Sequence, residues 1–256
     1  MKSGLVSVTF RELSPSRIVE LVAQGGLDGI EWGGDVHAPH GDLETAAQVA
    51  RLTRDAGLEV LAYGSYYRVC ESNDLPFERV IASADALGAP LIRIWAGRGE
   101  FSEMNDDYRQ RVALQTQQLA DRAGDAGLIL AFEYHRKTLT ETAESAQRLL
   151  ELVDRPNVKC LWQPDPGLSV EQNDAALRTV LPWLTNLHVF SWDSEGTRLP
   201  LAAGESWWSQ YLDTASTAPP SDTPGGRAAL IEFVADAEPE QFLADARTLR
   251  SWLAIS

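Results

Sequence analysis

The chain has 256 residues, 44% of them hydrophobic, which is long enough for one large core. Its 22 basic and 37 acidic residues give a net charge of −15, which repels polyanions at long range and argues against nucleic acid as a partner. No run approaches the roughly 18 apolar residues of a membrane-spanning helix, and the N-terminus does not look like a signal peptide. We therefore expect a cytoplasmic protein with no membrane partner.

Short apolar runs alternate with amphipathic segments along the whole chain. Serine or proline precedes several of the amphipathic segments and glycine follows them, which is typical of helix starts and stops. The apolar runs cover residues 5–10, 27–34, 58–67, 91–97, 128–135, 158–164, 187–192 and 228–234. Helical connections favour parallel pairing of successive strands. Eight such units in about 250 residues predict an α/β fold, a (β/α)8 barrel of eight parallel strands, as a single domain over residues 1–256.

An open, doubly wound sheet is the alternative architecture. That fold places a glycine-rich turn after its first strand, whereas this chain has Phe10, Arg11 and Glu12 there. In a barrel, functional side chains lie in the loops at the carboxyl ends of the strands. Polar residues at the ends of the apolar runs are therefore the candidates for a functional site.

The last four apolar runs each place one candidate metal ligand near the carboxyl end of a predicted strand. These residues are Glu133, Gln163, His188 and Glu232. Side chains alternate along a strand, so the four can point into the barrel together. Two carboxylates, an amide and an imidazole suit Mn²⁺, Mg²⁺, Co²⁺ or Zn²⁺. We predict a site for one divalent metal ion.

Other interpretations of these residues stay open. Asp165 can replace Gln163 as the ligand from the sixth strand if the backbone is shifted locally. Burying the carboxylate of Glu133 is costly without a partner, and an ion pair with Arg93 or Arg136 would satisfy it without a metal. His188, taken alone, is more often a core histidine with its hydrogen bonds satisfied.

These ligands, with the segments IEWGGDVH, IRIWAG, EYHRKTLTET and RLPLAAGESWW, resemble the xylose isomerase-like barrel family of sugar isomerases and epimerases, including proteins of the D-tagatose 3-epimerase type. The resemblance covers nearly the whole chain. It implies a divalent-metal-dependent isomerase or epimerase of a sugar or sugar-like keto compound. Glu133 and Glu232 would then be the catalytic residues that remove and return a proton next to a metal-bound carbonyl.

The chain departs from this family at the sixth strand. The family motif is an aspartate followed three positions later by a histidine, and here these positions hold Gln163 and Pro166. Losing one negative charge weakens metal binding and leaves the ion more electrophilic. The missing histidine, a substrate contact in the family, puts the standard epimerase mechanism in question.

Substrate contacts are predicted from residues near the other strand ends. His37, Trp95, His135 and Arg198 are the candidates for substrate binding. Trp32 and Trp162, like Trp95, can pack against the apolar face of a sugar ring. The expected partner is a small sugar or polyol, and a homo-oligomer is left open.

Two further functions compete with the isomerase or epimerase. A lyase or dehydratase acting on a keto-sugar or a 3-keto glycoside would use the same base and metal, and would then expel a β substituent. A catalytically degenerate, sugar-binding barrel is the alternative that is not an enzyme. The amide of Gln163 in place of a carboxylate keeps this last possibility open.

Overall fold

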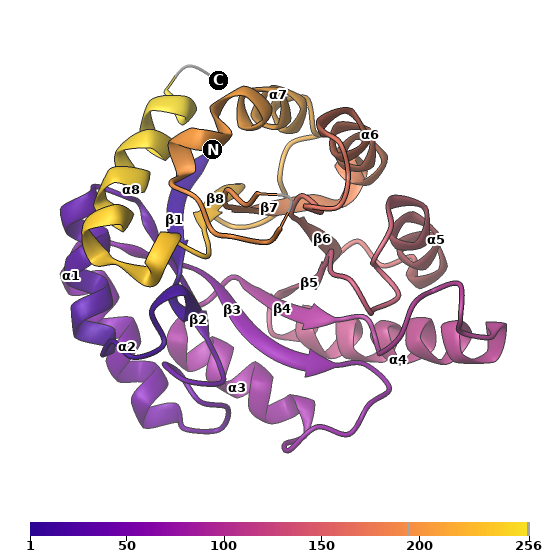
Figure 1. Ribbon diagram of the computed structural model, residues 1–256. Helices are drawn as coiled ribbons and strands as arrows, with labels where there is room; N and C mark the ends of the chain where they lie inside the picture. The colour runs from indigo at the N-terminus through magenta and orange to yellow at the C-terminus, as the bar shows by residue number, and fades with distance from the viewer. Residues whose placement is uncertain (194, 255–256) are drawn as a thin grey trace.

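A computed structural model describes residues 1–193 and 195–254 and shows a closed barrel of parallel strands in sequence order, with helices around the outside (Figure 1). In this part of the chain the strands are β1 (Lys2–Val6), β2 (Gly29–Gly33), β3 (Glu59–Arg68), β4 (Leu91–Trp95), β5 (Ile129–Glu133), β6 (Val158–Trp162), β7 (Leu184–Val189) and β8 (Ala228–Ile231). The helices are α1 (Pro15–Gly25), α2 (Leu43–Asp55), α3 (Phe77–Leu87), α4 (Asp106–Asp125), α5 (Ala143–Val153), α6 (Val170–Val180), α7 (Glu205–Ser216) and α8 (Pro239–Leu253). The predicted (β/α)8 barrel is confirmed.

The helix boundaries follow the signals in the sequence. The side chain of Ser14 accepts a hydrogen bond from the backbone of Arg17, and Pro15 is the first residue of α1. Gly26 ends this helix with φ of 67°, a left-handed conformation that costs glycine little. Thr142 and Ser169 close capping boxes at the starts of α5 and α6.

The first strand lies earlier in the chain than predicted. We expected residues 5–10 to be extended, but β1 ends at Val6 and residues 7–10 form a 3-10 helix, η1 (Ser7–Phe10). Pairing with β2 stops where Val6 meets Glu31, so the chain is free to turn there. The segment stays apolar beyond the strand because Phe10 is buried against Phe242, although Phe10 is not paired in the sheet.

Side chains alternate between the interior of the barrel and the helix layer, as the sequence led us to expect. Ala131 and Leu161 belong to a small cluster inside the barrel, and Leu230 belongs to a second one. Each lies two residues before Glu133, at the end of β5, Gln163, just after β6, or Glu232, just after β8. The predicted ligands from β5, β6 and β8 therefore share the inward face at the carboxyl end.

Two tryptophans do not lie where we predicted. Trp32 and Trp162 are fully buried in the large core between the strands and the helices. Trp32 donates a hydrogen bond to Thr53 of α2, and Trp162 packs on Trp208 of α7. Neither can reach a sugar in the barrel mouth, so that prediction was wrong. No helix in the described residues has the length and hydrophobicity needed to cross a lipid bilayer.

Candidate active site

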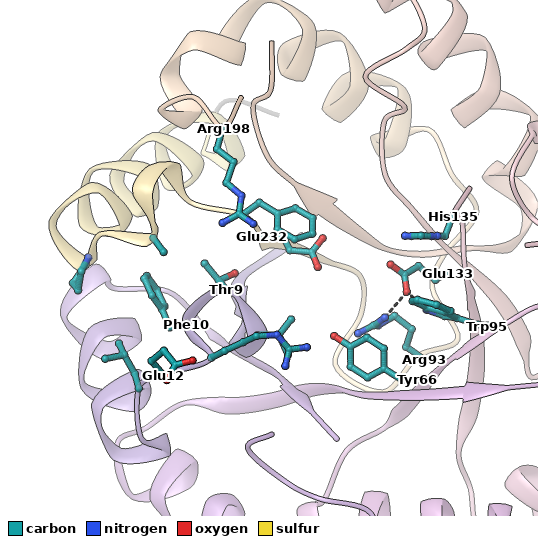
Figure 2. Close-up of a pocket in the computed structure, with 16 residues that line it drawn as sticks. Thr9, Phe10, Glu12, Tyr66, Arg93, Trp95, Glu133, His135, Arg198 and Glu232 are labelled. Atoms are coloured by element: carbon teal, nitrogen blue, oxygen red, sulfur yellow. Dashed lines mark hydrogen bonds and ion pairs between the residues drawn. The ribbon is translucent and has the colours of Figure 1, made fainter. Parts of the chain in front are cut away.

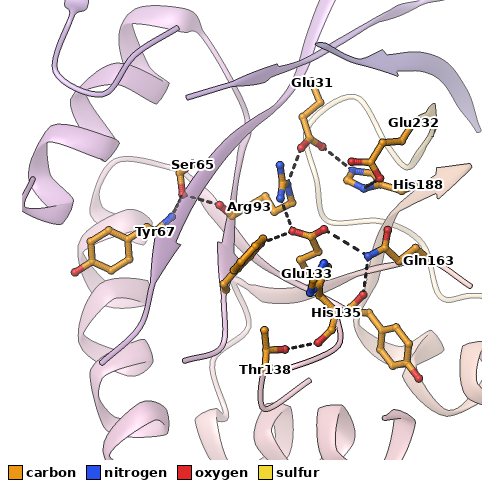
Figure 3. Close-up of polar contacts among 12 residues, drawn as sticks. Glu31, Ser65, Tyr67, Arg93, Glu133, His135, Thr138, Gln163, His188 and Glu232 are labelled. Carbon is orange, nitrogen blue, oxygen red and sulfur yellow. Dashed lines mark hydrogen bonds and ion pairs between the residues drawn. The ribbon is translucent and has the colours of Figure 1, made fainter. Parts of the chain in front are cut away.

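A buried cation connects two carboxylates at the carboxyl end of the barrel (Figure 3). Nε of Arg93 on β4 lies 2.7 Å from Oε1 of Glu31 on β2, and Nη1 of Arg93 pairs with Oε2 of Glu133 on β5. The same Oε2 accepts a hydrogen bond from the indole of Trp95. Oε2 of Glu133 therefore has two donors. The other oxygen, Oε1, lies 3.4 Å from the amide nitrogen Nε2 of Gln163.

His188 on β7 extends this cluster to the other side of the barrel. Its Nε2 is 3.2 Å from Oε2 of Glu31, and its Nδ1 is 3.1 Å from Oε2 of Glu232. The second pair is close enough for an ion pair, but Nδ1 and Oε2 are not aligned as a hydrogen bond: both atoms are buried and lack a hydrogen-bond partner among the described residues. Glu31 thus contacts both cationic side chains, Arg93 and His188.

The charges of this cluster explain its pKa shifts. Burial favours a neutral Glu31, but Arg93 and His188 outweigh it and lower the pKa of Glu31 to about 2. Burial likewise opposes ionisation of Glu133, and Arg93 reverses the effect and holds its pKa below the usual range. His188 is also disfavoured as a cation by burial, yet Glu232 and Glu31 raise its pKa to about 10. Three carboxylates still face only one arginine and one histidine.

Gly64 on β3 leaves the space that the Arg93–Glu31 ion pair occupies. A Cβ at this position would lie 2.6 Å from Nη2 of Arg93 and 2.9 Å from Oε1 of Glu31. We expect Gly64→Ala to lower the free energy of unfolding by about 1–3 kcal/mol, since overpacking displaces groups that are already in contact. Urea denaturation checks this. An unchanged midpoint and slope would show that the pair can move aside without cost.

The donor chemistry of the cluster fits a divalent metal ion, although the side chains are not gathered around one point. No three His, Cys, Asp or Glu side chains in the described residues are grouped so that they could hold a metal as they stand. Nδ1 of His188 and Oε2 of Glu232 are nevertheless buried without hydrogen-bond partners, and Oε1 of Glu133 has only the long contact to Gln163. Metal-bound histidines usually donate their other ring N–H to a carboxylate, and Glu31 is placed to accept it. The metal site stays a prediction.

A cavity of about 450 Å³ opens above the cluster (Figure 2). Glu133 and Glu232 reach it from opposite sides, and Arg93 lies at its base. Trp95 and His135 stack with ring centroids 4.9 Å apart and also line it. Its remaining walls come largely from η1 and the loops after β1, β7 and β8.

His135 and Arg198 are placed to meet a ligand in this first cavity. Nδ1 of His135 lies 2.7 Å from the carbonyl oxygen of Arg136, which can only accept, so the neutral ring carries its free lone pair on Nε2. The Arg198 side chain is exposed, lines the cavity and lies over the ring of Phe233 at 5.0 Å. No carboxylate pairs with Arg198 in the described part of the chain.

A second cavity of about 470 Å³ adjoins the first and shares Glu133, His135 and Phe233 with it. Gln163 and Asp165 both line this second cavity. Only Gln163 contacts Glu133, because a carboxylate oxygen of Asp165 is turned to the backbone N–H of Gly167, 2.8 Å away. The geometry therefore brings Gln163, rather than Asp165, to the other predicted ligands.

The structure brings most of the predicted site residues to these two cavities. Trp95, Glu133, His135, Gln163, Arg198 and Glu232 line one or both of them, and His188 lies directly beneath. His37 does not line either cavity and is buried beside Ser7, 2.9 Å from its hydroxyl. Glu31 and Tyr66 were not predicted as site residues, although both lie beside Arg93. The available signal was that both residues lie near the end of a predicted strand.

Comparison with known proteins places this site in context. The model of the xylose isomerase-like TIM barrel family matches residues 19–206. A curated relative, 3-dehydroshikimate dehydratase of Bacillus anthracis, is 27% identical over 209 residues, which cover 73% of this chain and 71% of the relative.

Solved structures with the same fold carry two kinds of name. A probable 3-DHS dehydratase from Bacillus anthracis superposes with a TM-score of 0.79 at 20% identity, covering 98% of this chain and 99% of the other. D-psicose 3-epimerase, crystallised in the presence of D-fructose, gives a TM-score of 0.70 at 19% identity, covering 100% and 98% of the two chains. At these identities the structures show a shared fold.

Proposed function

Because the chain belongs to the family of xylose isomerase-like TIM barrels, we propose that it is a lyase that removes water from a hydroxylated keto compound in the first cavity. The similarity to a 3-dehydroshikimate dehydratase, which extends over 73% of the chain, supports elimination. It favours the lyase over the isomerase or epimerase that the resemblance of the sequence first implied.

One observation carries the proposal: a glutamate whose side chain pairs only with His188 in the described residues lines the same cavity as a fixed carboxylate–guanidinium pair. That glutamate is Glu232, whose Oε2 lies 3.1 Å from Nδ1 of His188, and the fixed pair is Glu133 with Arg93. Removing a proton next to a carbonyl needs an accessible base, and a carboxylate already bound by two donors is a weak one. Glu232 is therefore assigned as the base, and Glu133 as the group that Arg93 and Trp95 hold in place.

The substrate class is inferred from the charges around the cavity. The guanidinium of Arg198 is exposed at the wall and pairs with no carboxylate in the described residues, so it can bind a substrate carboxylate. The proposed substrate is accordingly a cyclic hydroxy keto acid, such as 3-dehydroshikimate. Trp95 offers a flat apolar surface beside it.

A divalent ion is part of this proposal. Glu133, Gln163, His188 and Glu232 would hold it. When bound, it would polarise the substrate carbonyl and so make the adjacent C–H more acidic. Glu31 would orient the imidazole of His188, and Arg93 would keep Glu31 and Glu133 ionised.

The direct test is incubation of the Mn²⁺-loaded protein with 3-dehydroshikimate and with hydroxy keto sugars in deuterated water. A lyase yields a product that has lost one water, seen by mass spectrometry and by the absorbance of a new conjugated system. A substrate that gains deuterium and keeps its water would instead indicate an epimerase. If neither change occurs with any compound of the panel, both enzyme proposals are contradicted and the sugar-binding barrel remains.

The epimerase remains the second candidate because of one geometric feature. Glu133 on β5 and Glu232 after β8 reach the cavity from opposite sides, as two bases acting on the two faces of one carbon must (Figure 2). D-psicose 3-epimerase shares the fold. The binding of Glu133 by Arg93 and Trp95 weighs against an equal exchange of protons by the two glutamates.

Replacing Gln163 by aspartate tests the metal site without an activity assay. Gln163→Asp restores a negative charge among the proposed ligands and should tighten Mn²⁺ binding about tenfold or more, because cation affinity follows the charge of the ligand set. Calorimetric titration with Mn²⁺ measures this. Asp165→Asn is the matched control, and a loss of Mn²⁺ affinity in that variant would identify Asp165 as the ligand instead.

A further inference from the structure

Tyr66 is held at the barrel mouth by an irregular segment of β3. The pairing of β3 with β4 shifts between Gly64 and Tyr67, so Ser65 and Tyr66 are additional to the regular ladder. Tyr66 has φ of 55°, in the left-handed region that is strained for an aromatic residue. The hydroxyl of Ser65 fixes the bulge by donating to the carbonyl oxygen of Arg93 at 2.6 Å. Bulges beside active sites commonly redirect a side chain.

The bulge directs the Tyr66 side chain into the first cavity. Figure 2 shows its ring beside Arg93, with the hydroxyl turned toward the space between Glu133 and Glu232. The guanidinium carbon of Arg93 lies 4.6 Å from the ring centroid. On its other side the ring meets Trp95 edge-on, with centroids 5.8 Å apart. A strained backbone thus places one phenol among the charged groups of the site.

Elimination of water requires a group that can donate a proton to the departing hydroxyl. Glu133 is unsuited, because its Oε2 already accepts from the guanidinium of Arg93 and the indole of Trp95. Burial raises the pKa of Tyr66, and this effect outweighs the opposing charge of Arg93, so the phenol keeps its proton at neutral pH. The nearby guanidinium would also stabilise the phenolate left after transfer.

We propose that Tyr66 is the catalytic acid that protonates the leaving hydroxyl, an inference that rests on the proposed lyase function. In this step a carboxylate takes the proton next to the carbonyl, and the electrons of that C–H bond form the new C=C bond. The C–O bond to the β-hydroxyl breaks as its oxygen takes the phenolic proton of Tyr66, and one water leaves. Solvent returns a proton to the phenolate, so no oxidant or reductant is consumed.

Tyr66→Phe removes only the hydroxyl, and Tyr67→Phe is its matched control. Tyr67 packs on Phe77 with ring centroids 4.9 Å apart and does not line the first cavity. We expect Tyr66→Phe to slow the elimination of water by about 10²–10³-fold, the range of general acid catalysis. Tyr67→Phe should stay close to the wild-type rate.

Two readouts separate an acid from a residue that merely shapes the cavity. A substrate analogue with acetate in place of the β-hydroxyl needs no proton on its leaving group, so Tyr66→Phe should eliminate acetate at nearly the wild-type rate. The variant should also still exchange the proton next to the carbonyl for deuterium. Equal losses for both leaving groups, or no loss for water, would overturn the assignment of Tyr66. If the wild-type protein eliminates neither group, the lyase proposal itself is overturned.

Discussion

Replacing Arg93 with methionine is expected to lower the free energy of unfolding by about 3–5 kcal/mol, the typical cost of removing one partner from a buried ion pair. Arg93 is 1% exposed, and its guanidinium is the cation that contacts both Glu31 and Glu133. Without it, His188 alone faces three buried carboxylates. Methionine fills much of the same volume but cannot compensate their charge, so the loss comes from electrostatics rather than from a cavity.

Urea denaturation of wild type and Arg93→Met gives this difference directly. Arg122→Met is the control, because Arg122 pairs with Glu78 at the surface, where the side chains are 54% and 58% exposed. Exposed pairs contribute between about 0 and 1 kcal/mol, so this variant should unfold near the wild-type midpoint. Similar midpoints for all three proteins would mean that water or protons can compensate Glu31 and Glu133 without Arg93.

The barrel and the inward face of its last strands were predictable because both arise from periodicity. Parallel strands joined by helices give a repeating pattern of apolar runs and amphipathic segments. Ala131, Leu161 and Leu230 point into the barrel. The side chains two residues later, Glu133, Gln163 and Glu232, therefore point inward as well. Strands of such a barrel are apolar on both faces, however, so hydrophobicity alone does not say which face is which. The prediction for Trp32 and Trp162 was wrong for this reason: their side chains point to the outer face of the strands, toward the helices.

The ion pairs and the bulge could not be read from the sequence. Arg93 and Glu31 are 62 positions apart and lie on strands separated by β3, so their contact depends on strand register and on the missing side chain of Gly64. The left-handed backbone of Tyr66 leaves no trace in residue type, since tyrosine is common in regular strands. Pattern reasoning finds the strands that build this site but not the interactions between non-neighbouring strands.

The choice between lyase and epimerase is hard because both reactions begin with the same proton removal. We assign Glu232 as the base in either one, and Arg93 holds Glu133 in place in either one. The reactions differ in their second step, which is either departure of a β-hydroxyl or return of a proton to the opposite face. A neutral acid near the leaving group favours the first outcome, so Tyr66 bears on the reaction type as well as on its rate.

The largest effect on catalysis is expected for Glu232→Gln, with kcat falling by about 10⁴-fold, the upper end of the range for a general base. The amide keeps the size of the side chain but cannot accept the substrate proton, and it also weakens one proposed metal ligand. Steady-state kinetics at saturating Mn²⁺ measures the loss, and far-UV circular dichroism checks that the barrel is intact.

Glu238→Gln is the matched control, because Glu238 is exposed in the segment after β8 and lines neither cavity. This variant removes the same charge from the same region, and its kcat should stay within about twofold of the wild-type value. A loss of kcat in Glu232→Gln alone therefore cannot come from the change in net charge. Turnover by Glu232→Gln within tenfold of wild type would instead assign proton removal to another group. Nε2 of His135 is then the candidate, because the carbonyl of Arg136 holds its other nitrogen as the donor and leaves this one free to accept.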